Sequence, residues 1–451
     1  MTMNALVETK KFIKKSSLVR GLLYRYGTRK VSKRCVYYEQ NESLWPDIQK
    51  AYLYELLSYA KIHSQYFRNL IPDKIDCSDA IEVLKNLPFL TKDIIREQGE
   101  RIFSDEIKTK KHGWANTGGS TGEPLRFPTL GSDHHMETVC QMMLYHQMGV
   151  DGIKDLIISI DGTRIPQKDV DKKVFWKKEP ANFPYGQYCL STLHMSDETI
   201  PYYIEFLNNM QPKAMRGYPS GFMELATYCK KNKVKFGFKL KGIYLTSENY
   251  GSEEESLISE VFCCPVWGQY GHTEASIFAV KKPQSINYIC CPIYGYAEIL
   301  AEDGRHVKEG EVGEIVVSGF NHYGIPFIRY KTGDLAEFGG TLQNGSVVLN
   351  KLLGRSIDYL INREGEKIFL VGFIFGGHLK AFNHIRQWQL EQFEKGNVSM
   401  KISKAEGYNE EIEKEIVALF ESKHLSVNIQ YTTNFERTNR GKFKFLIQHI
   451  R

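Results

Sequence analysis

Short apolar runs alternate with helix-like segments through the middle of the chain, and this alternation restricts the possible fold most. A short run of consecutive apolar residues between turn signals predicts a strand that is buried on both faces. Such strands are predicted at 156–160 and 242–245, with a helix at 220–228 between them. The pattern therefore predicts an α/β protein with largely buried strands.

Two helices have recognisable starts in the sequence. Pro46 opens a helical pattern that continues to Ile62, and proline suits a first helical turn because its missing N–H costs nothing there. Ser252 followed by Glu255 predicts a capping box at the start of a helix that runs to about Phe262.

The last third of the chain changes character twice. Residues 292–353 are rich in alternating, strand-like segments, and a domain boundary is predicted near Gly354. Beyond the boundary we predict a small α+β domain with helices at 376–393 and 409–423 and strands at 398–402 and 427–431. The predicted organisation is thus a leader over 1–35, a large multi-sheet α/β domain over 36–353 that ends in a β-rich part, and a small C-terminal domain over 354–451.

Composition narrows the class of protein. Charged residues make up 25% of the 451 residues and hydrophobic ones 42%, which is ordinary for a globular protein. No apolar stretch approaches the ~20 residues needed to span a bilayer. Nine cysteines form an odd count without a Cys-x-x-Cys pair, so a disulfide framework is not expected and a reducing, cytoplasmic environment is.

Positive charge is concentrated at the N-terminus. Residues 1–35 hold ten Lys and Arg against Glu8 alone, a net of +9, whereas the remaining chain has 49 Lys and Arg against 52 Asp and Glu. Apolar residues lie between these charges at partly helical spacing, so the leader could lie on an anionic membrane surface, here the inner membrane face. A solvated or weakly docked helix is the alternative. Nucleic acid is not expected as a partner, because no basic patch continues into the body.

A run of glycine and hydroxyl residues suggests a phosphate-binding loop. Residues 116–124 read Asn-Thr-Gly-Gly-Ser-Thr-Gly-Glu-Pro. Glycines leave backbone N–H groups open to a ligand, and the hydroxyls of Thr117, Ser120 and Thr121 add donors that could wrap the oxygens of a polyphosphate. No Gly-Lys-Ser/Thr follows, so this is not a Walker loop. Taken alone, the run could equally be a flexible surface turn.

Four further motifs follow this loop in order. They are Trp-Gly-Gln-Tyr-Gly-His-Thr-Glu-Ala-Ser at 267–276, Arg-Tyr-Lys-Thr-Gly-Asp at 329–334, Gly-Arg-Ser-Ile-Asp at 354–358, and Arg-Thr-Asn-Arg-Gly-Lys-Phe-Lys-Phe-Leu at 437–446. In this order they resemble the adenylate-forming superfamily of acyl- and aryl-CoA ligases, luciferases and peptide-synthetase adenylation domains. Tyr-Gly-His-Thr-Glu and Arg-Thr-x-Arg-Gly-Lys are most similar to CapK-like proteins of capsule and polysaccharide biosynthesis, in the branch that also holds phenylacetate–CoA ligases.

The resemblance implies an adenylation domain over 36–353 and a lid domain over 354–451. In that chemistry a carboxylate attacks the α-phosphorus of ATP and pyrophosphate leaves, so the site must neutralise charge and align two anions. The resemblance implies that Glu274 is the Mg²⁺ carboxylate, that Thr273 contacts phosphate, and that Asp334 accepts both ribose hydroxyls. The ATP-binding residues that it implies are Thr117, Gly118, Gly119, Ser120, Thr121, Gly122, Ser247, Glu248, Gln269, Tyr270, Gly271, His272, Asp334 and Arg355, with Gln269 and Tyr270 along the adenine.

A lysine near the C-terminus completes the implied catalytic set. Lys442 follows Gly441 in a basic, turn-like segment. The resemblance implies that this lysine reaches the carboxylate and the α-phosphate during adenylation, a reach that suits a compact ammonium on a long stem. Without the resemblance, a lysine beside Arg437, Arg440 and Lys444 would be interpreted as part of a solvated charge run.

The sequence departs from the superfamily pattern in two places. The loop usually carries a lysine after its last glycine, whereas Glu123 follows here; Arg126 could substitute. The hinge usually reads Gly-Arg-x-Asp-Asp, but Ile357 stands at the customary pivot, and Asp358 could shift the pivot by one residue. Domain rotation is therefore a weaker expectation than the nucleotide site.

Some relatives hold a zinc ion with Cys and His just after the Thr-Glu motif. Here Ile289 stands where a histidine would be expected, and adjacent cysteines are poorly spaced to ligate one tetrahedral ion. We interpret four cysteines as buried small hydrophobic residues rather than zinc ligands: Cys263, Cys264, Cys290 and Cys291.

The function that the resemblance implies is that of an ATP- and Mg²⁺-dependent carboxylate ligase working through an acyl-adenylate. Its substrate would be a small-molecule or sugar-linked carboxylic acid, and its acceptor an amine, a hydroxyl or, with CoA as a further cofactor, a thiol. The acid pocket is expected near 216–220, 244–249 and 267–271. The alternative from another class is a non-catalytic member of a polysaccharide assembly complex, docked on the membrane by residues 1–35.

Overall fold

The computed structural model describes most of the chain. It describes residues 30–117, 125–131, 135–152, 154–179, 187–355, 359–370, 373, 384–405, 407–432, 434–437 and 443–450. Several predicted features lie outside these residues: most of the leader, Gly118, Gly119, Ser120, Thr121, Gly122, Ile357, Asp358 and Lys442.

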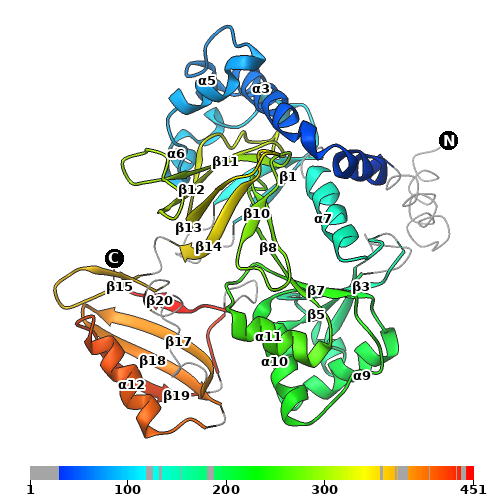
Figure 1. Cartoon of the computed structure of the whole chain (residues 1–451), viewed down its shortest axis with the longest axis vertical. Helices are drawn as coiled ribbons and strands as arrows, with labels where there is room; N and C mark the ends of the chain where they lie inside the picture. The colour runs from blue at the N-terminus through cyan, green and yellow to red at the C-terminus, as the bar shows by residue number, and fades with distance from the viewer. Residues whose placement is uncertain are drawn as a thin grey trace.

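A sheet of twelve strands forms the body of the protein (Figure 1). Its strands are β3 (Ile157–Asp161), β4 (Trp176–Glu179), β5 (Gln187–Ser191), β6 (Ala214–Gly217), β7 (Gly242–Thr246), β8 (Val266–Gly271), β9 (Phe278–Lys281), β10 (Tyr288–Cys290), β11 (Gly295–Leu300), β12 (Val312–Gly319), β13 (Tyr330–Thr341) and β14 (Val347–Arg355). The order is β11-β12-β13-β14-β10-β9-β8-β7-β6-β3-β5-β4.

The sheet has a parallel and an antiparallel part. Strands β5, β3, β6, β7 and β8 run parallel to one another. From β8 through β9 to β11 the neighbours are antiparallel. Strand β8 therefore belongs to both parts, and its carboxyl end lies where they meet.

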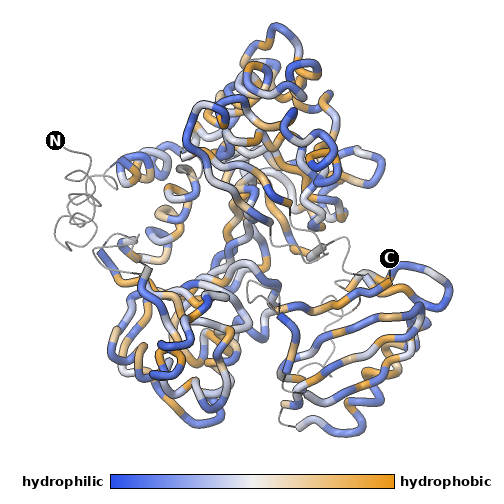
Figure 2. The backbone as a smooth tube through the Cα atoms, turned by 180° about the vertical axis from the view of Figure 1, so that it is seen from behind, coloured by the Kyte–Doolittle hydropathy of each residue, from blue (hydrophilic) through white to orange (hydrophobic). Residues whose placement is uncertain are grey.

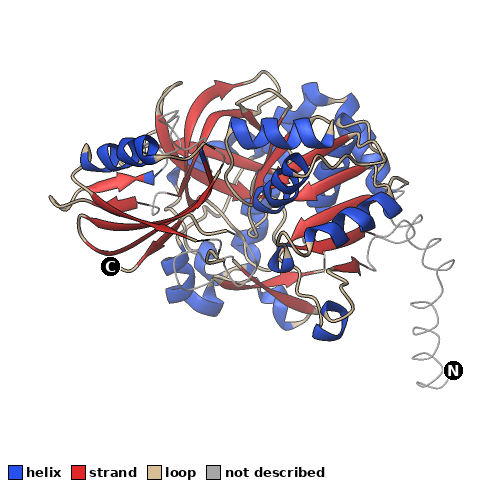
Figure 3. Ribbon diagram, turned by 90° about the horizontal axis from the view of Figure 1, so that it is seen from below, coloured by secondary structure: helices blue, strands red, loops and turns tan. Residues whose placement is uncertain are grey.

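Helices lie on both sides of the strands, as Figure 3 shows. The longer ones are α3 (Trp45–His63), α7 (His135–Gln147), α9 (Ile200–Met210), α10 (Pro219–Lys231), α11 (Ser252–Phe262) and α12 (Glu410–Glu421). The short ones are η1 (Glu42–Leu44), α4 (Gln65–Arg68), η2 (Cys77–Asp79), α5 (Ala80–Asn86), α6 (Lys92–Gln98), η3 (Gly99–Arg101), η4 (Asp105–Lys108), α8 (Gln167–Val170) and η6 (Thr192–His194). Among the described helices, none combines the length and the apolar character that crossing a membrane requires.

Each part of the body has its own apolar core. Phe222, Leu245 and Ile258 belong to a cluster that joins α9, α10 and α11 to the parallel strands. Leu57 and Phe327 belong to a second cluster, which joins α3, α5 and α6 to the antiparallel strands. Buried strands between helices explain why these segments are nearly continuous apolar runs in the sequence.

A third cluster lies between α7, the sheet and a helix over residues 30–40. Cys35 and Tyr38 of this helix are buried in it, together with Met143 and Tyr294. The last residues of the predicted leader thus belong to a helix that packs on the body.

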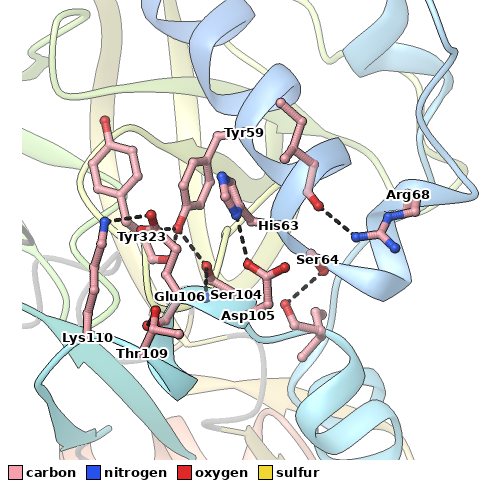
Figure 4. A network of polar contacts seen from close by, with 12 residues as sticks. Tyr59, His63, Ser64, Arg68, Ser104, Asp105, Glu106, Thr109, Lys110 and Tyr323 are labelled. Atoms are coloured by element: carbon pink, nitrogen blue, oxygen red, sulfur yellow. Dashed lines mark hydrogen bonds and ion pairs between the residues drawn. The ribbon is translucent and has the colours of Figure 1, made fainter.

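A polar network fixes the segment that leads to the glycine-rich loop (Figure 4). The hydroxyl group of Tyr59 in α3 lies 2.6 Å from Ser104 Oγ and 3.0 Å from Glu106 Oε2, and it donates to the backbone oxygen of Tyr323 at 2.9 Å. His63 Nδ1 lies 2.8 Å from Asp105 Oδ1. These contacts position the start of the hairpin formed by β1 (His112–Asn116) and β2 (Arg126–Leu130).

The chain after β14 forms separate small sheets. Strands β15 (Tyr359–Ile361) and β16 (Lys367–Phe369) pair with each other, and β17 (Ile385–Glu394), β18 (Asn397–Lys404), β19 (Ser426–Tyr431) and β20 (Leu446–Gln448) form a sheet in the order β19-β18-β17-β20. Helix α12 packs against this C-terminal sheet (β17–β20) through Ile416 and Phe420. Figure 2 shows hydrophobic residues along its strands and hydrophilic ones in most of its turns.

The predicted α/β class and most of the predicted elements are confirmed. The helix predicted at 376–393 is wrong where the structure describes it, because Ile385–Glu394 is strand β17, with a neighbour on each side. The error has a physical cause: Gln389 and Gln392 resemble the polar face of a helix, yet both are buried. Their side-chain amides donate to backbone oxygens of Glu436 and Ile361.

Two local predictions are also corrected. Helix α11 is capped by Glu254, whose carboxylate accepts the backbone N–H of Gly251 at 2.9 Å; Ser252 is not the cap, and Glu255 instead pairs with Lys281. Cys263 is exposed rather than buried, because it ends α11 in a left-handed conformation with φ +49°, whereas Cys264 and Cys290 are buried as predicted and Cys291 is half-buried.

Candidate active site

A cavity of about 1470 Å³ opens at the carboxyl ends of β7 and β8. Ligands of open α/β sheets characteristically bind outside the carboxyl ends of the parallel strands. Trp388 and Phe443, from the C-terminal part of the chain, line the same cavity. The cavity brings together these predicted residues: Thr117, Ser247, Glu248, Gln269, Tyr270, Gly271, His272, Thr273, Glu274 and Asp334.

Glu274 is a buried carboxylate that the site keeps ionised. Its side chain follows β8, accepts a hydrogen bond from Tyr330 Oη at 2.7 Å, and lies 3.3 Å from His272 Nδ1. Burial alone would raise the pKa of Glu274, but His272 and Tyr330 together lower the pKa to about 2. Neither ring nitrogen of His272 has an aligned hydrogen-bond partner among the described residues, so the contact with Glu274 is an ion pair only when His272 is protonated.

Tyr270 and Asp334 join the two halves of the sheet across the cavity. Tyr270 Oη, at the end of β8, donates to Asp334 Oδ2 in β13 at 2.7 Å. Burial and the neighbouring carboxylate both raise the pKa of Tyr270, so its phenol stays protonated and remains a donor. Asp334 is in turn held by its own backbone N–H, which donates to Thr332 Oγ1 at 3.1 Å.

The glycine-rich loop is closed at its base. Thr117 is buried, and its Oγ1 accepts the N–H of Leu125 at 2.9 Å while its N–H donates to Leu125 O at 2.9 Å. The loop over 118–124 therefore begins and ends at one fixed point on the cavity wall.

Glu248 links the end of β7 to two other segments. It follows Ser247, which has φ +73°, an uncommon conformation for a non-glycine residue. Glu248 Oε2 accepts the backbone N–H of Ser220 in the first turn of α10 at 3.0 Å, and Glu248 Oε1 accepts the backbone N–H of Phe443 at 2.7 Å. Burial raises the pKa of Glu248.

A second contact fastens the C-terminal part of the chain to the same place. Arg437 pairs with Glu224 of α10 and donates to Ser220 Oγ at 3.3 Å. Burial raises the pKa of Glu224 to about 7, although Arg437 opposes the shift. Arg437 and Phe443 also form an antiparallel bridge with each other, so one end of the segment between them is held at α10 and the other at Glu248.

Comparisons with known proteins agree with this architecture. The chain is 29% identical over 328 residues to the protein CapK of Staphylococcus aureus, which covers 70% of this chain and 69% of CapK. A solved 2-hydroxyisobutyryl-CoA ligase in the postadenylation state, in complex with R3-HIB-AMP, matches with a TM-score of 0.67 at 17% identity, over 89% of this chain and 88% of that one. The chain has the adenylate-forming ligase fold.

A second solved structure of this kind is an acyl acid amido synthetase in complex with 2,4-DB, with a TM-score of 0.58 at 15% identity over 88% of this chain and 89% of that one. No protein-family model matches the chain. The resemblance to CapK-like proteins and to adenylate-forming ligases that the motifs predicted is confirmed.

Several cavity residues of this adenylate-forming fold were missed in the sequence. Tyr330 and Thr332 lie within the Arg-Tyr-Lys-Thr-Gly-Asp motif, which could have indicated them. Lys92 of α6 also lines the cavity, but it stands well before the glycine-rich loop and no local pattern marks it. Arg126, considered as a substitute for the missing loop lysine, is instead exposed and stacks on Trp114, with its guanidinium carbon 4.5 Å from the ring centroid.

The cavity residues fit a magnesium ion that accompanies a nucleotide. Mg²⁺ in such sites is held by one or two carboxylates together with phosphate oxygens and water. Glu274 supplies one carboxylate whose lowered pKa keeps it ionised, and the cavity has room for phosphates beside it.

Proposed function

We propose that this chain is an ATP-dependent carboxylate ligase that forms an acyl-adenylate and releases pyrophosphate. The observation that carries the proposal is one cavity, at the carboxyl end of β8, that gathers Thr117, Glu274 and Asp334 from three distant motifs. The similarity to CapK and the adenylate-forming fold support it.

Each cavity wall has its own task in the proposed reaction. The closed loop based at Thr117 and Leu125 wraps the phosphates with backbone N–H groups, and Asp334, held by Tyr270, binds the ribose hydroxyls. Glu274 with Thr273 would hold Mg²⁺, which neutralises phosphate charge when bound. The carboxylate of the acid attacks the α-phosphorus, and the bond from that phosphorus to pyrophosphate breaks.

Residues 354–451 act as a lid in this proposal. Lys442 supplies the cation for the α-phosphoryl group and the acid carboxylate, and Arg437 and Phe443 hold its segment at α10 and at Glu248. The supporting contacts are the pair between Arg437 and Glu224 and the hydrogen bond from the Phe443 N–H to Glu248.

The group that accepts the acyl moiety from the adenylate is proposed from the similar proteins. The CapK similarity favours an amine or hydroxyl acceptor in polysaccharide biosynthesis, and the acyl acid amido synthetase shares the fold with an amide-forming reaction in its name. A CoA thiol is the second candidate, favoured by the 2-hydroxyisobutyryl-CoA ligase match.

ATP–pyrophosphate exchange across a panel of aryl, hydroxy, amino and uronic acids tests the proposal. We expect exchange with at least one class, dependent on Mg²⁺ and lost in Glu274→Ala, with AMP as the nucleotide product. Formation of ADP and phosphate would contradict adenylate chemistry. Absence of exchange with every acid, together with absence of ATP binding, would favour the non-catalytic alternative.

A further inference from the structure

A cysteine, a glutamate and a histidine converge outside the cavity of the proposed active site. Cys35 and Glu39 stand four residues apart on the helix over 30–40, so they share one helix face. His146 lies in the last turn of α7. The sulfur, carboxylate and ring-nitrogen atoms of these three side chains all lie within 4.8 Å of one another, a spacing that could hold a metal ion.

The distances within the group match those between the ligands of one ion. Cys35 Sγ lies 3.4 Å from His146 Nδ1, and both carboxylate oxygens of Glu39 lie 3.1 Å from the same nitrogen. Zinc–sulfur and zinc–nitrogen bonds of ~2.3 and ~2.05 Å at a tetrahedral angle put sulfur about 3.6 Å from nitrogen, and nitrogen about 3.3 Å from oxygen.

One imidazole nitrogen faces three partner atoms. His146 Nδ1 carries either one proton or one lone pair, so it makes one good hydrogen bond. The other neighbouring atoms then have no well-aligned hydrogen bond to this nitrogen. A cation between the three side chains contacts a lone pair of each. Thiolate, imidazole and carboxylate together are a ligand set that suits zinc, whereas magnesium and calcium prefer oxygen ligands alone.

We propose that Cys35, Glu39 and His146 bind a zinc ion that fastens the helix over 30–40 to α7. Cys35 is fully buried in an apolar cluster rich in methionine, which shields the metal from one side. The side chains of Glu39 and His146 are 29% and 33% exposed, so a water molecule completes the tetrahedron on the open side. None of the three lines the described cavity, so the proposed ion lies outside the proposed active site.

Zinc content of the full-length, tag-free protein tests the assignment. After treatment with a chelator and dialysis, the protein is titrated with zinc chloride against a chromophoric competitor and then analysed for bound metal. We expect one zinc ion per chain, loss of this binding in Cys35→Ser and in His146→Gln, and affinity weakened by roughly tenfold or more in Glu39→Gln, whose amide is a poorer ligand. Cys229→Ser, a buried cysteine of α10, is the matched control and should bind zinc as the wild type does.

Cobalt provides a readout that a hydrogen-bonded cluster without a metal would not give. Cobalt(II) added to the metal-free protein should produce thiolate-to-cobalt charge-transfer absorption in the wild type and Cys229→Ser, and none in Cys35→Ser. Circular dichroism should show that the variants remain folded. Failure of the wild type to hold zinc more tightly than Cys35→Ser and His146→Gln would overturn the proposal and leave a hydrogen-bonded cluster only.

Discussion

Replacing Arg437 by alanine should loosen the C-terminal part of the chain from α10 in a way that depends on pH. The structure, in which Arg437 is bound to Glu224 and Phe443 to Glu248, is here called the closed arrangement. In it, burial raises the pKa of Glu224 from 4.5 to about 7, so the closed arrangement binds more protons between these two pH values than an open one, in which Glu224 is exposed to water. The contribution of Glu224 to closure is therefore fully present below pH 4.5 and is lost as the pH rises through 7.

The magnitude follows from the same numbers. Without the guanidinium, the buried carboxyl of Glu224 keeps its proton to a still higher pH. At pH 6 the carboxyl is protonated in both proteins, so the loss of charge pairing costs little. At pH 8.5 the wild-type carboxylate is ionised and paired, and keeping it protonated in the variant costs about 1.4 kcal/mol for each of roughly 1.5 pH units, or about 2 kcal/mol.

Hydrogen exchange of the Phe443 amide should report this opening, because that N–H donates to Glu248 in the structure and would lose this acceptor if residues 437–443 left α10 and Glu248. After correction for intrinsic exchange rates, protection in Arg437→Ala should fall roughly thirtyfold below wild type at pH 8.5 and much less at pH 6. Arg305→Ala, which removes an exposed pair with Glu311, is the control and should leave the Phe443 amide unchanged. Equal protection of this amide in Arg437→Ala and wild type at pH 8.5 would refute the reasoning.

Three further outcomes are expected. Lys442→Ala should slow adenylation by about 10²-fold or more, with ATP binding little changed and transfer from a synthetic acyl-adenylate retained; adenylation at the wild-type rate would remove the lid assignment. Tyr330→Phe removes a hydrogen bond to ionised Glu274 and should lower the free energy of unfolding, measured in urea at pH 7, by about 1.5–3 kcal/mol. The difference from wild type should shrink as the pH falls towards 2, because the carboxylate of Glu274 becomes protonated there. Deletion of residues 1–29, which spares the packed helix over 30–40, should weaken cosedimentation with anionic vesicles at low salt, and unchanged binding would exclude the membrane-surface role.

Local patterns in the sequence were enough to predict most of the helices and strands in the body of the protein. Parallel strands buried on both faces leave apolar runs that are visible without the fold, as at β7. The prediction of a helix at the position of β17 was wrong because the hydrogen bonds that allow its glutamines to be buried come from backbone oxygens of distant segments, which the local sequence does not show. The motifs indicated Glu274 and Asp334, which both line the cavity, whereas Lys92 and the partners of Arg437 come together only through tertiary packing.

The cluster of Cys35, Glu39 and His146 could not be predicted for the same reason, since His146 lies more than a hundred residues from the other two in the sequence. The zinc site of some relatives of the superfamily would lie near Cys290 and Cys291, which the sequence predicts to be small packing residues instead. The Sγ of Cys291 lies 3.7 Å from that of Cys140, in keeping with the packing role predicted for it.

The twelve-stranded sheet also sets the mechanics of the molecule. Each strand from β11 to β4 pairs with its neighbour, although the register shifts within the β12–β13 and β13–β14 pairs, so the cavity walls that stand on β7, β8 and β13 belong to one continuous sheet. A large change of angle between the parallel and antiparallel parts of such a sheet would break hydrogen bonds between neighbouring strands. If residues 354–451 move as the proposed lid, we expect the amides of β8 to stay protected from hydrogen exchange while those of the C-terminal sheet, beyond the end of β14, respond to the movement.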